Sequence, residues 1–199
     1  TLAEWRAQLA EAVAELHALA AEPGARPSAA LTLGIGYRAL ARVRGVAEAA
    51  PARARRGFAA ASVETLDVRR PYAAYFAIEA HRLRHPRFDG HRSEPIERAV
   101  FVSGDAATLL PFDPARRRVL LVEQFRIGPH ARRDPLPWCL EAIAGRCDPG
   151  ESAEATARRE AREEAGIEIG RIERIAGYYS TPGIASEHIT AFVGEADLA

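Results

Sequence analysis

The spacing of apolar residues divides the chain into a helical first quarter and a longer stretch rich in strands. Near the start, apolar residues recur at steps of three and four positions, as they do along one face of an α-helix. They are Leu2, Trp5, Leu9, Val13, Leu16 and Leu19. Thr1 and Glu4 match a capping box at the beginning of this helix, and the Glu-Pro-Gly run at 22–24 predicts its end.

A second, weaker helical pattern follows Ser28. Its apolar positions are Leu31, Ile35, Leu40, Val43 and Val46. Gly34 and Gly36 argue against a regular first turn, because glycine costs about 1 kcal/mol relative to alanine inside a helix. Residues 51–57, PARARRG, are typical of a linker. We therefore expect residues 1–57 to form a helical appendage or the remnant of a preceding domain.

From residue 58 onward, short runs of alternating apolar and polar residues are bounded by turn residues, which indicates β-strands. The expected strands cover residues 62–67, 72–83, 96–103, 106–112, 119–125, 138–144, 172–179 and 189–193. Asp89-Gly90 predicts a hairpin turn, and residues 128–137 predict a polar loop that contains proline. Strands outnumber helices and the principal helix lies between them, so we expect an α+β fold with a layered, mixed sheet after the helical segment.

The principal helix belongs to residues 145–167, which read GRCDPGESAEATARREAREEAGI. Pro149-Gly150 is a turn signal, and Glu151 or Ser152 can open the helix, where negative charge suits the helix dipole. Gly166 can end it in the left-handed conformation. Alanines recur at every fourth position and predict a face that packs closely on a sheet. They are Ala153, Ala157, Ala161 and Ala165.

Three carboxylates crowd another face of this helix. Glu160, Glu163 and Glu164 are neighbours because residues three and four apart share a helical face. Like charges this close destabilise a bare helix by roughly a few tenths of a kcal/mol per pair. The chain contains no lysine, and the nearby arginines are expected to project largely to other sides of the helix. These are Arg158, Arg159 and Arg162. A bound divalent metal is the natural counter-charge, since Mg²⁺ prefers oxygen ligands.

Composition narrows the classes of protein and partner. The 27 basic residues balance 27 acidic ones, which indicates neither a nucleic-acid nor a membrane-surface partner. No apolar run approaches the roughly 20 residues that span a bilayer, and no signal peptide is visible. Cys139 and Cys147 fit neither a disulfide framework nor a zinc spacing, so we expect a reducing, cytoplasmic setting. The chain begins with Thr and lacks Met, which is typical of a fragment or a processed product.

The spacing of residues 145–167 resembles the signature of the Nudix hydrolases. The AREEA core alone is typical of any surface helix, but here glycines stand at both ends, an acid opens the helix and RE-x-x-EE follows at the expected distance. The resemblance implies an α/β/α sandwich over residues 58–199 that hydrolyses a nucleoside diphosphate linked to another group. It also implies Mg²⁺ or Mn²⁺ as the cofactor.

The resemblance further implies a role for each motif residue. Glu160 and Glu164 would be the principal metal ligands, and Glu163 would be a further ligand or would orient a metal-bound water. The remaining positions are a backbone-carbonyl ligand, a structural ion pair between loop and helix, and two glycines that shape the motif. They are Ala144, Glu151 with Arg159, and Gly145 with Gly166.

Residues 72–199 are similar to the bacterial ADP-ribose pyrophosphatase branch of this family. The similarity lies in LLPFDPARRRVLLVEQFRIGP, PWCLEAIAG and TPGIASE, and Pro182 stands fifteen positions after Ile167, as the branch's marker proline does. It implies hydrolysis of ADP-ribose to AMP and ribose 5-phosphate by a homodimer. The additional N-terminal region also resembles Nudix proteins associated with tellurite resistance.

The same resemblance proposes substrate contacts outside the motif. Arg126 would contact the substrate phosphates, although an arginine at a strand end is an equally good interpretation. Tyr75, from the partner subunit, would stack on adenine, or it could be a core residue. Arg98 would contact the nucleotide from that subunit, but neighbouring Ala99 replaces an acidic residue of the family pattern. Glu141 could support the metal ligands or be a surface residue.

The catalytic base of this branch lies on a loop after the strand that ends near Val193, and the sequence stops at Ala199. We therefore expect the C-terminal part of the domain, with the base, to be missing, and we assign neither Glu187 nor Glu195 to that role. Two alternatives remain: hydrolysis of other nucleoside diphosphate derivatives, and a non-catalytic nucleotide sensor. The intact acidic triplet argues against the sensor, which has no need of crowded carboxylates.

Overall fold

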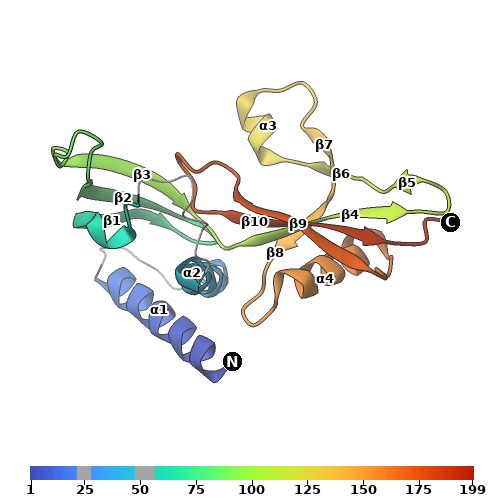
Figure 1. Cartoon of the computed structure of the whole chain (residues 1–199), viewed down its shortest axis with the longest axis horizontal. Helices are drawn as coiled ribbons and strands as arrows, with labels where there is room; N and C mark the ends of the chain where they lie inside the picture. The colour runs from blue at the N-terminus through green and yellow to red at the C-terminus, as the bar shows by residue number, and fades with distance from the viewer. Residues whose placement is uncertain (22–27, 48–56) are drawn as a thin grey trace. The chain divides into compact units, whose positions relative to one another are not determined.

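The computed structural model describes residues 1–21, 28–47 and 57–199 (Figure 1). These residues form two compact units, each of which is described by itself. The first unit comprises Thr1–Gly104 and Ser180–Glu187, and the second comprises Asp105–Tyr179 and His188–Ala199. The expected helix end at 22–24 and the expected linker up to residue 56 lie outside the described residues.

Two helices begin the first unit, as predicted. They are α1, Leu2–Ala20, and α2, Ala29–Ala47. The capping box at Thr1 is present, with the Glu4 amide donating to Thr1 Oγ1 over 3.2 Å. Leu19 packs in a small core with Leu31 and Ile35. Most of the apolar stripe of α1 is exposed, whereas the carboxylate of Glu15 is buried.

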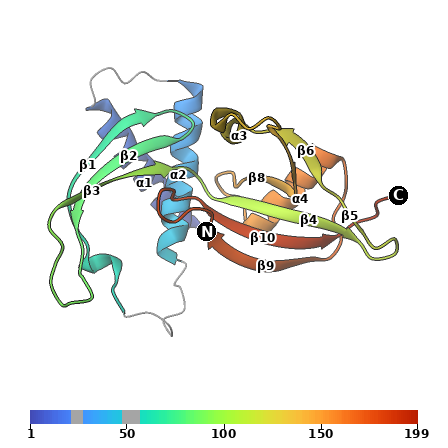
Figure 2. The same cartoon turned by 90° about the horizontal axis from the view of Figure 1, so that it is seen from above.

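A three-stranded antiparallel sheet completes most of the first unit (Figure 2). Its strands, in sheet order, are β1, Glu64–Ala73, β2, Ala77–Arg84, and β3, Ile96–Val102, and a short 3-10 turn, Ala60–Ser62, precedes them. The expected strand over 72–83 was wrong in one respect, because residues 74–76 form a turn that the Ala74 amide closes on the Phe76 carbonyl over 2.8 Å. Tyr75 therefore lies in a turn and not in a strand. The turn at Gly90, with φ of +88°, is present as predicted.

The loop Ser180–Glu187 belongs to the first unit, although the strands that flank it belong to the second. The Phe101 amide donates to the Ile184 carbonyl over 2.8 Å, and the Ser186 amide donates to the Phe101 carbonyl over 2.9 Å. These bonds attach the loop, which contains Pro182, to β3.

A mixed sheet forms the framework of the second unit. The order is β5-β4-β10-β9, and β8 also pairs with β4. The strands are β4, Ala106–Asp113, β5, Arg118–Val119, β8, Ile143–Arg146, β9, Ile172–Tyr179, and β10, His188–Glu195. β4 and β10 are parallel and the other pairs are antiparallel. The expected α+β class and mixed sheet are confirmed.

Two predicted strands are each divided between this sheet and a separate hairpin. The hairpin consists of β6, Val122–Phe125, and β7, Trp138–Glu141. The expected strand 119–125 is thus shared between β5 and β6, and 138–144 between β7 and β8. Neither segment contains a glycine, proline or other turn residue that would mark such a division. The expected loop 128–137 contains the short helix α3, Ile127–Arg132.

The helix α4, Ala153–Ala165, packs against β8 and β4 (Figure 1). Its buried residues are Thr156, Ala157 and Ala161. Two of the four predicted packing alanines are thus buried, as are Leu109 of β4 and Ile143 of β8. Among the helices of the described ranges, none is long and apolar enough to cross a membrane.

Candidate active site

The turn before α4 and the two ends of the helix follow from local chemistry. Gly150 has φ of +90°, a conformation that side chains disfavour. Ser152 is the N-cap, and its Oγ accepts from the Ala155 amide over 3.1 Å. Gly166 ends the helix with φ of +65°, and the next amide, from Ile167, donates to the Ala161 carbonyl. The helix therefore begins and ends at defined residues, and this fixes where its carboxylates lie.

Gly145 makes room for the carboxylate of Glu160. A Cβ added at Gly145 would lie 1.8 Å from Glu160 Oε1 and 2.0 Å from its Cδ. Gly145 lies in β8, which pairs with β4, so the backbone has no freedom to retreat. A glycine is required here because the Glu160 side chain of α4 lies directly on the strand.

Arg159 lies among the carboxylates of α4. This corrects the expectation that its side chain projects to another side of the helix than the acidic face formed by Glu160, Glu163 and Glu164. Its Nη1 donates to Glu160 Oε1 over 2.7 Å and to Glu163 Oε2 over 3.0 Å. Its Nε and Nη2 donate to the two oxygens of Glu151 over 2.9 and 3.1 Å. Glu163 is one helical turn after Arg159. The long side chain of Arg159 lies along that turn, and its guanidinium therefore reaches the carboxylates of Glu160 and Glu163.

The pKa of Glu160 is raised above its ordinary value. Burial is the largest cause, and the charges of Glu163 and Glu164 raise it further, against the lowering effect of Arg159. The side chain of Glu160 is 13% exposed, whereas that of Glu163 is 58% exposed. Burial and the acidic neighbours therefore disfavour the ionised form of Glu160 despite the contact with Arg159, and a further cation would stabilise it.

Glu151 holds the turn to the helix. The hydrogen bond from Arg159 is the largest cause of its lowered pKa, and bonds from the Thr156 hydroxyl and the Asp148 amide add to it. Thr156, which we did not predict, is fully buried and donates to Glu151 Oε2 over 2.8 Å. Its position one turn after the N-cap could have indicated that its hydroxyl bonds near the start of the helix.

Glu164 is held by two donors from neighbouring strands. Gln124 Nε2 donates to Glu164 Oε1 over 2.7 Å, and the Ala144 amide donates to Oε2 over 3.3 Å. Gln124 was also missed by sequence reasoning. It lies between the exposed residues Glu123 and Phe125 of β6, so strand alternation places it on the covered face.

Arg126 forms an ion pair with Glu141 across the β6–β7 hairpin. The Arg126 Nε lies 2.9 Å from Glu141 Oε2, and its Nη2 lies 2.5 Å from the same oxygen. This hydrogen bonding is the largest cause of the raised pKa of Arg126, to which the charge of Glu164 also contributes. The guanidinium is therefore held at the side of the hairpin that carries Gln124 and its partner Glu164.

The second unit brings together one part of the predicted site. It contains the residues predicted for the metal, the motif structure and the phosphates, which are Ala144, Gly145, Glu151, Arg159, Glu160, Glu163, Glu164, Gly166 and Arg126. Tyr75, Arg98 and Pro182 belong to the first unit. Tyr75 is in the β1–β2 turn, Arg98 is in β3 and donates to the Glu97 carbonyl, and Pro182 is in the loop Ser180–Glu187.

The carboxylates suit a divalent cation by their chemistry, although they are not arranged around one. Within residues 1–21, 28–47 and 57–199, no three His, Cys, Asp or Glu side chains converge into a metal-binding group. Arg159 lies between Glu160 and Glu163, and Gln124 holds Glu164. Carboxylate oxygens are the ligands that Mg²⁺ and Mn²⁺ prefer, and burial together with the charges of Glu163 and Glu164 disfavours a Glu160 carboxylate that has no further cation beside it.

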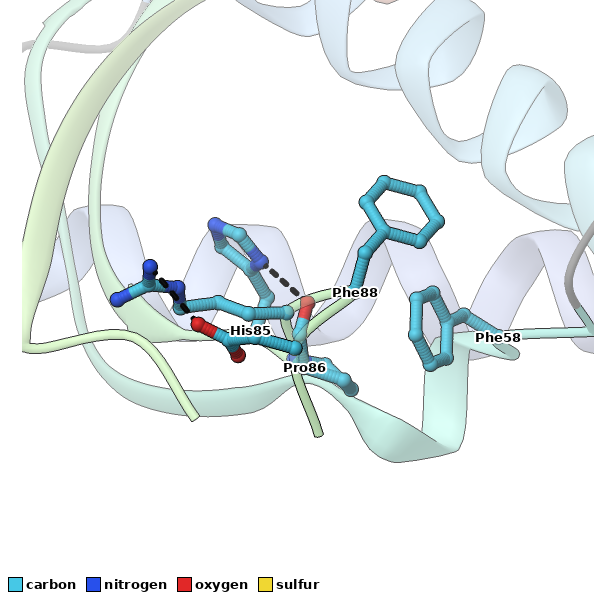
Figure 3. A pocket seen from close by; sticks show the side chains of 6 residues that line it. Phe58, His85, Pro86 and Phe88 are labelled. Carbon is cyan, nitrogen blue, oxygen red and sulfur yellow. Dashed lines mark hydrogen bonds and ion pairs between the residues drawn. The ribbon is translucent and has the colours of Figure 1, made fainter. Parts of the chain in front are cut away.

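A surface hollow of about 500 Å³ lies elsewhere, in the first unit (Figure 3). It is lined by Phe58, His85, Pro86, Arg87, Phe88 and Asp89. Its polar groups contact one another, since His85 Nδ1 lies 2.9 Å from the Pro86 carbonyl and Arg87 lies 2.9 Å from Asp89. The rings of Phe58 and Phe88 supply the rest of the lining. The one carboxylate in this lining, Asp89, is paired with Arg87, so the hollow lacks a group of carboxylates like that of α4.

Comparisons with known proteins agree with the motif. Residues 102–197 match the NUDIX domain model. The ADP-ribose pyrophosphatase of Escherichia coli (strain K12) is 43% identical over 126 residues, which are 63% of this chain and 60% of that relative. The ADP-ribose pyrophosphatase of Haemophilus influenzae is 35% identical over 144 residues, which are 71% of this chain and 66% of that relative.

Two further matches extend the comparison. The GDP-mannose pyrophosphatase of Pectobacterium atrosepticum is 37% identical over 100 residues, which are 50% of this chain and 51% of that relative. A solved structure described as an ADP compounds hydrolase matches with a TM-score of 0.53 and 21% identity, covers 67% of each chain, and supports the fold alone. The chain thus spans about 60% of the length of the Escherichia coli relative. Residues 102–197 of the chain are thus a NUDIX domain, and the chain is similar to bacterial ADP-ribose pyrophosphatases.

Proposed function

We propose that the protein hydrolyses the pyrophosphate of ADP-ribose to AMP and ribose 5-phosphate. The observation that carries this proposal is the acidic face of α4, formed by Glu160, Glu163 and Glu164, where Arg159 contacts two of the carboxylates and the charges of Glu163 and Glu164 raise the pKa of Glu160. The similarity to two ADP-ribose pyrophosphatases supports the choice of substrate. Residues 58–199 would form the hydrolase domain and residues 1–57 its appendage.

The cofactor in this proposal is Mg²⁺ or Mn²⁺. Glu160, Glu163 and Glu164 would hold it, together with the backbone carbonyl of Ala144. When bound, the ion neutralises pyrophosphate charge and makes water a better nucleophile. The Arg159 contacts with Glu160 and Glu163 would yield to the ion, whereas its paired bonds to Glu151 would keep the helix on its loop.

The chain's own residues would position the substrate. Arg126, oriented by Glu141, would bind the phosphates beside the acidic face. Tyr75 and Arg98 would contact the nucleoside from the partner subunit of a homodimer, and Pro182 would shape the substrate loop. Tyr75 is 38% exposed, and this exposure supports its proposed contact with a base.

A second candidate is hydrolysis of a different nucleoside diphosphate sugar. The relative from Pectobacterium atrosepticum, at 37% identity, is described as a GDP-mannose pyrophosphatase. The acidic face would act on the pyrophosphate in either substrate, and only the nucleoside contacts would differ. Comparing turnover of ADP-ribose and GDP-mannose by the same preparation separates the two candidates.

Release of AMP from ADP-ribose in the presence of Mg²⁺ tests the main proposal. We expect Glu164→Gln to lower kcat at least about a hundredfold, because a neutral amide loses the charge that holds the ion. Glu168→Gln is the matched control, since Glu168 is an exposed glutamate just beyond α4. Unchanged turnover in Glu164→Gln would refute the metal assignment. Tight binding of ADP-ribose without turnover of any nucleoside diphosphate sugar would favour a sensor.

A further inference from the structure

One face of α2 lies directly against the turn between β1 and β2. A Cβ added at Gly34 would lie 2.3 Å from the Ala74 carbonyl oxygen and 2.7 Å from that of Tyr75. Gly34 thus lets the helix approach the turn backbone more closely than a residue with a side chain would. This close approach explains why a glycine unfavourable to the helix occupies its second turn.

Arg38, one helical turn after Gly34, bonds to the same turn. It is fully buried, and its Nη1 donates to the Ala74 carbonyl over 3.2 Å and to the Tyr75 carbonyl over 3.4 Å. Its Nε donates to Glu15 of α1 over 2.7 Å, and its Nη2 also contacts Glu15. A fully buried arginine is costly unless each of its donors is used. Here the donors are divided between a counter-charge and the turn backbone.

Tyr37, between these two residues, contacts the Tyr75 ring itself. The two rings meet edge to face with their centroids 5.8 Å apart. Tyr37 is buried and packs closely on Gly104, where an added Cβ would lie 2.6 Å from Tyr37 Cβ. The ring of Tyr37 is therefore a fixed support for Tyr75.

We propose that Gly34, Tyr37 and Arg38 are positioning residues for the nucleoside site, because they hold the β1–β2 turn and its Tyr75 ring in one orientation. The inference rests on the proposed role of Tyr75 as the aromatic that stacks on the base. It assigns the N-terminal helices to recognition of the nucleoside and not to the hydrolytic step, since none of the three residues contributes to the acidic face of α4.

Calorimetric binding of two ligands to the whole chain without metal tests this proposal. ADP-ribose carries the base, and inorganic pyrophosphate lacks it. We expect Tyr75→Ala and Arg38→Met each to weaken ADP-ribose binding about five- to a hundredfold, the range of one base–aromatic stack, and to leave pyrophosphate binding unchanged. In the double variant, the loss should not exceed that of Tyr75→Ala alone. Arg42→Met is the matched control, because Arg42 pairs with Glu15 and Glu79 but makes no bond to the turn.

Gly34→Ala tests the same contact without removing a buried charge. The added methyl group must displace the Ala74 carbonyl, so ADP-ribose binding should weaken as in Arg38→Met. Gly45→Ala, in the same helix but with no atom within 4 Å of the added Cβ, should bind both ligands like the parent chain.

The outcomes separate this inference from the proposed function. If Tyr75→Ala binds ADP-ribose normally, both the role of Tyr75 and the positioning fail. If Tyr75→Ala weakens binding but Gly34→Ala and a folded Arg38→Met do not, only the positioning fails. Equal losses for ADP-ribose and pyrophosphate, or an equal effect of Arg42→Met, would indicate a general folding defect and overturn the inference. Because binding is measured without turnover, absence of hydrolysis would contradict the proposed activity alone.

Discussion

At the scale of single residues, the positions of the carboxylates on the acidic face of α4 depend on the residues that surround them. Arg159 links Glu151 to Glu160 and Glu163, and Gly145 leaves the space that the Glu160 carboxylate fills. Gln124 and the Ala144 amide orient Glu164. Residues that orient ligand groups typically change metal affinity or activity by roughly 10- to 100-fold when they are replaced.

Gly145→Ala should therefore impair the site without removing any charged group. The new methyl group would lie 1.8 Å from Glu160 Oε1 and must push that carboxylate away from β8. We expect kcat with ADP-ribose and Mg²⁺ to fall roughly 10- to 100-fold. Steady-state kinetics measures this, and Gly128→Ala is the control because nothing lies within 4 Å of its added Cβ. Equal kinetics for the two variants would contradict the arrangement of Gly145 and Glu160.

At the scale of elements, the helices and the pattern of strands were largely predictable, whereas the assignment of strands to sheets was not. The caps of α4 lie in the local sequence, because Ser152 and Gly166 act on backbone groups a few residues away. The division of 119–125 between β5 and β6, and of 138–144 between β7 and β8, depends on partner strands far along the chain. The turn at residues 74–76 was likewise not predictable from the sequence, because its two aromatic residues are typical of strands.

Asp113, the last residue of β4, links the end of this strand to the turn after it and to the C-terminal residues. Its buried carboxylate accepts from the Ala115 and Arg116 amides over 2.9 Å, from the Arg116 guanidinium over 2.7 Å, and from the Leu198 amide over 3.1 Å. The Arg116 amide is the largest cause of a pKa held well below its usual range. Because the folded pKa is depressed, the charge of Asp113 stabilises the fold above about pH 4 and loses this effect as the pH falls further.

We expect Asp113→Asn to lower the melting temperature by several degrees at pH 7 and by progressively less as the pH falls below about 4. Thermal unfolding followed by circular dichroism at pH 7 and pH 3 measures the difference. Asp134→Asn is the control, since Asp134 is exposed and accepts one bond, from the Leu136 amide. A difference in melting temperature that stays the same at both pH values would contradict the ionic role of Asp113.

At the scale of the whole molecule, the proposed site would draw on two subunits of a homodimer. The acidic face and Arg126 lie in the second unit, and Tyr75, Arg98 and Pro182 lie in the first. The proposed homodimer supplies Tyr75 and Arg98 to the acidic face of the other subunit. In a symmetric dimer the same exchange occurs twice, so each dimer has two equivalent sites.

Mixing two defective variants tests this exchange. Glu164→Gln lacks the metal ligand and Tyr75→Ala lacks the ring, so a mixed dimer has one site with both defects and one site with neither. After subunits are exchanged, we expect about a quarter of all sites to regain the parental KM for ADP-ribose. If Tyr75 serves its own subunit, no such sites form. Each variant alone is the control, and sedimentation of the mixture verifies that a dimer is present.

Local sequence patterns were enough to predict the helical start of the chain, the α+β class and the placement of three carboxylates on one capped helix, because spacing, caps and turn residues act over a few positions. They also indicated the Nudix family through the spacing of residues 145–167. The groups that meet these carboxylates depend on tertiary packing: Arg159 turns toward them, and Gln124 donates to Glu164. The close approach of Gly34 to the turn that carries Tyr75 is likewise a tertiary contact. Contacts of this kind depend on how closely two backbones approach, and local spacing does not encode that distance.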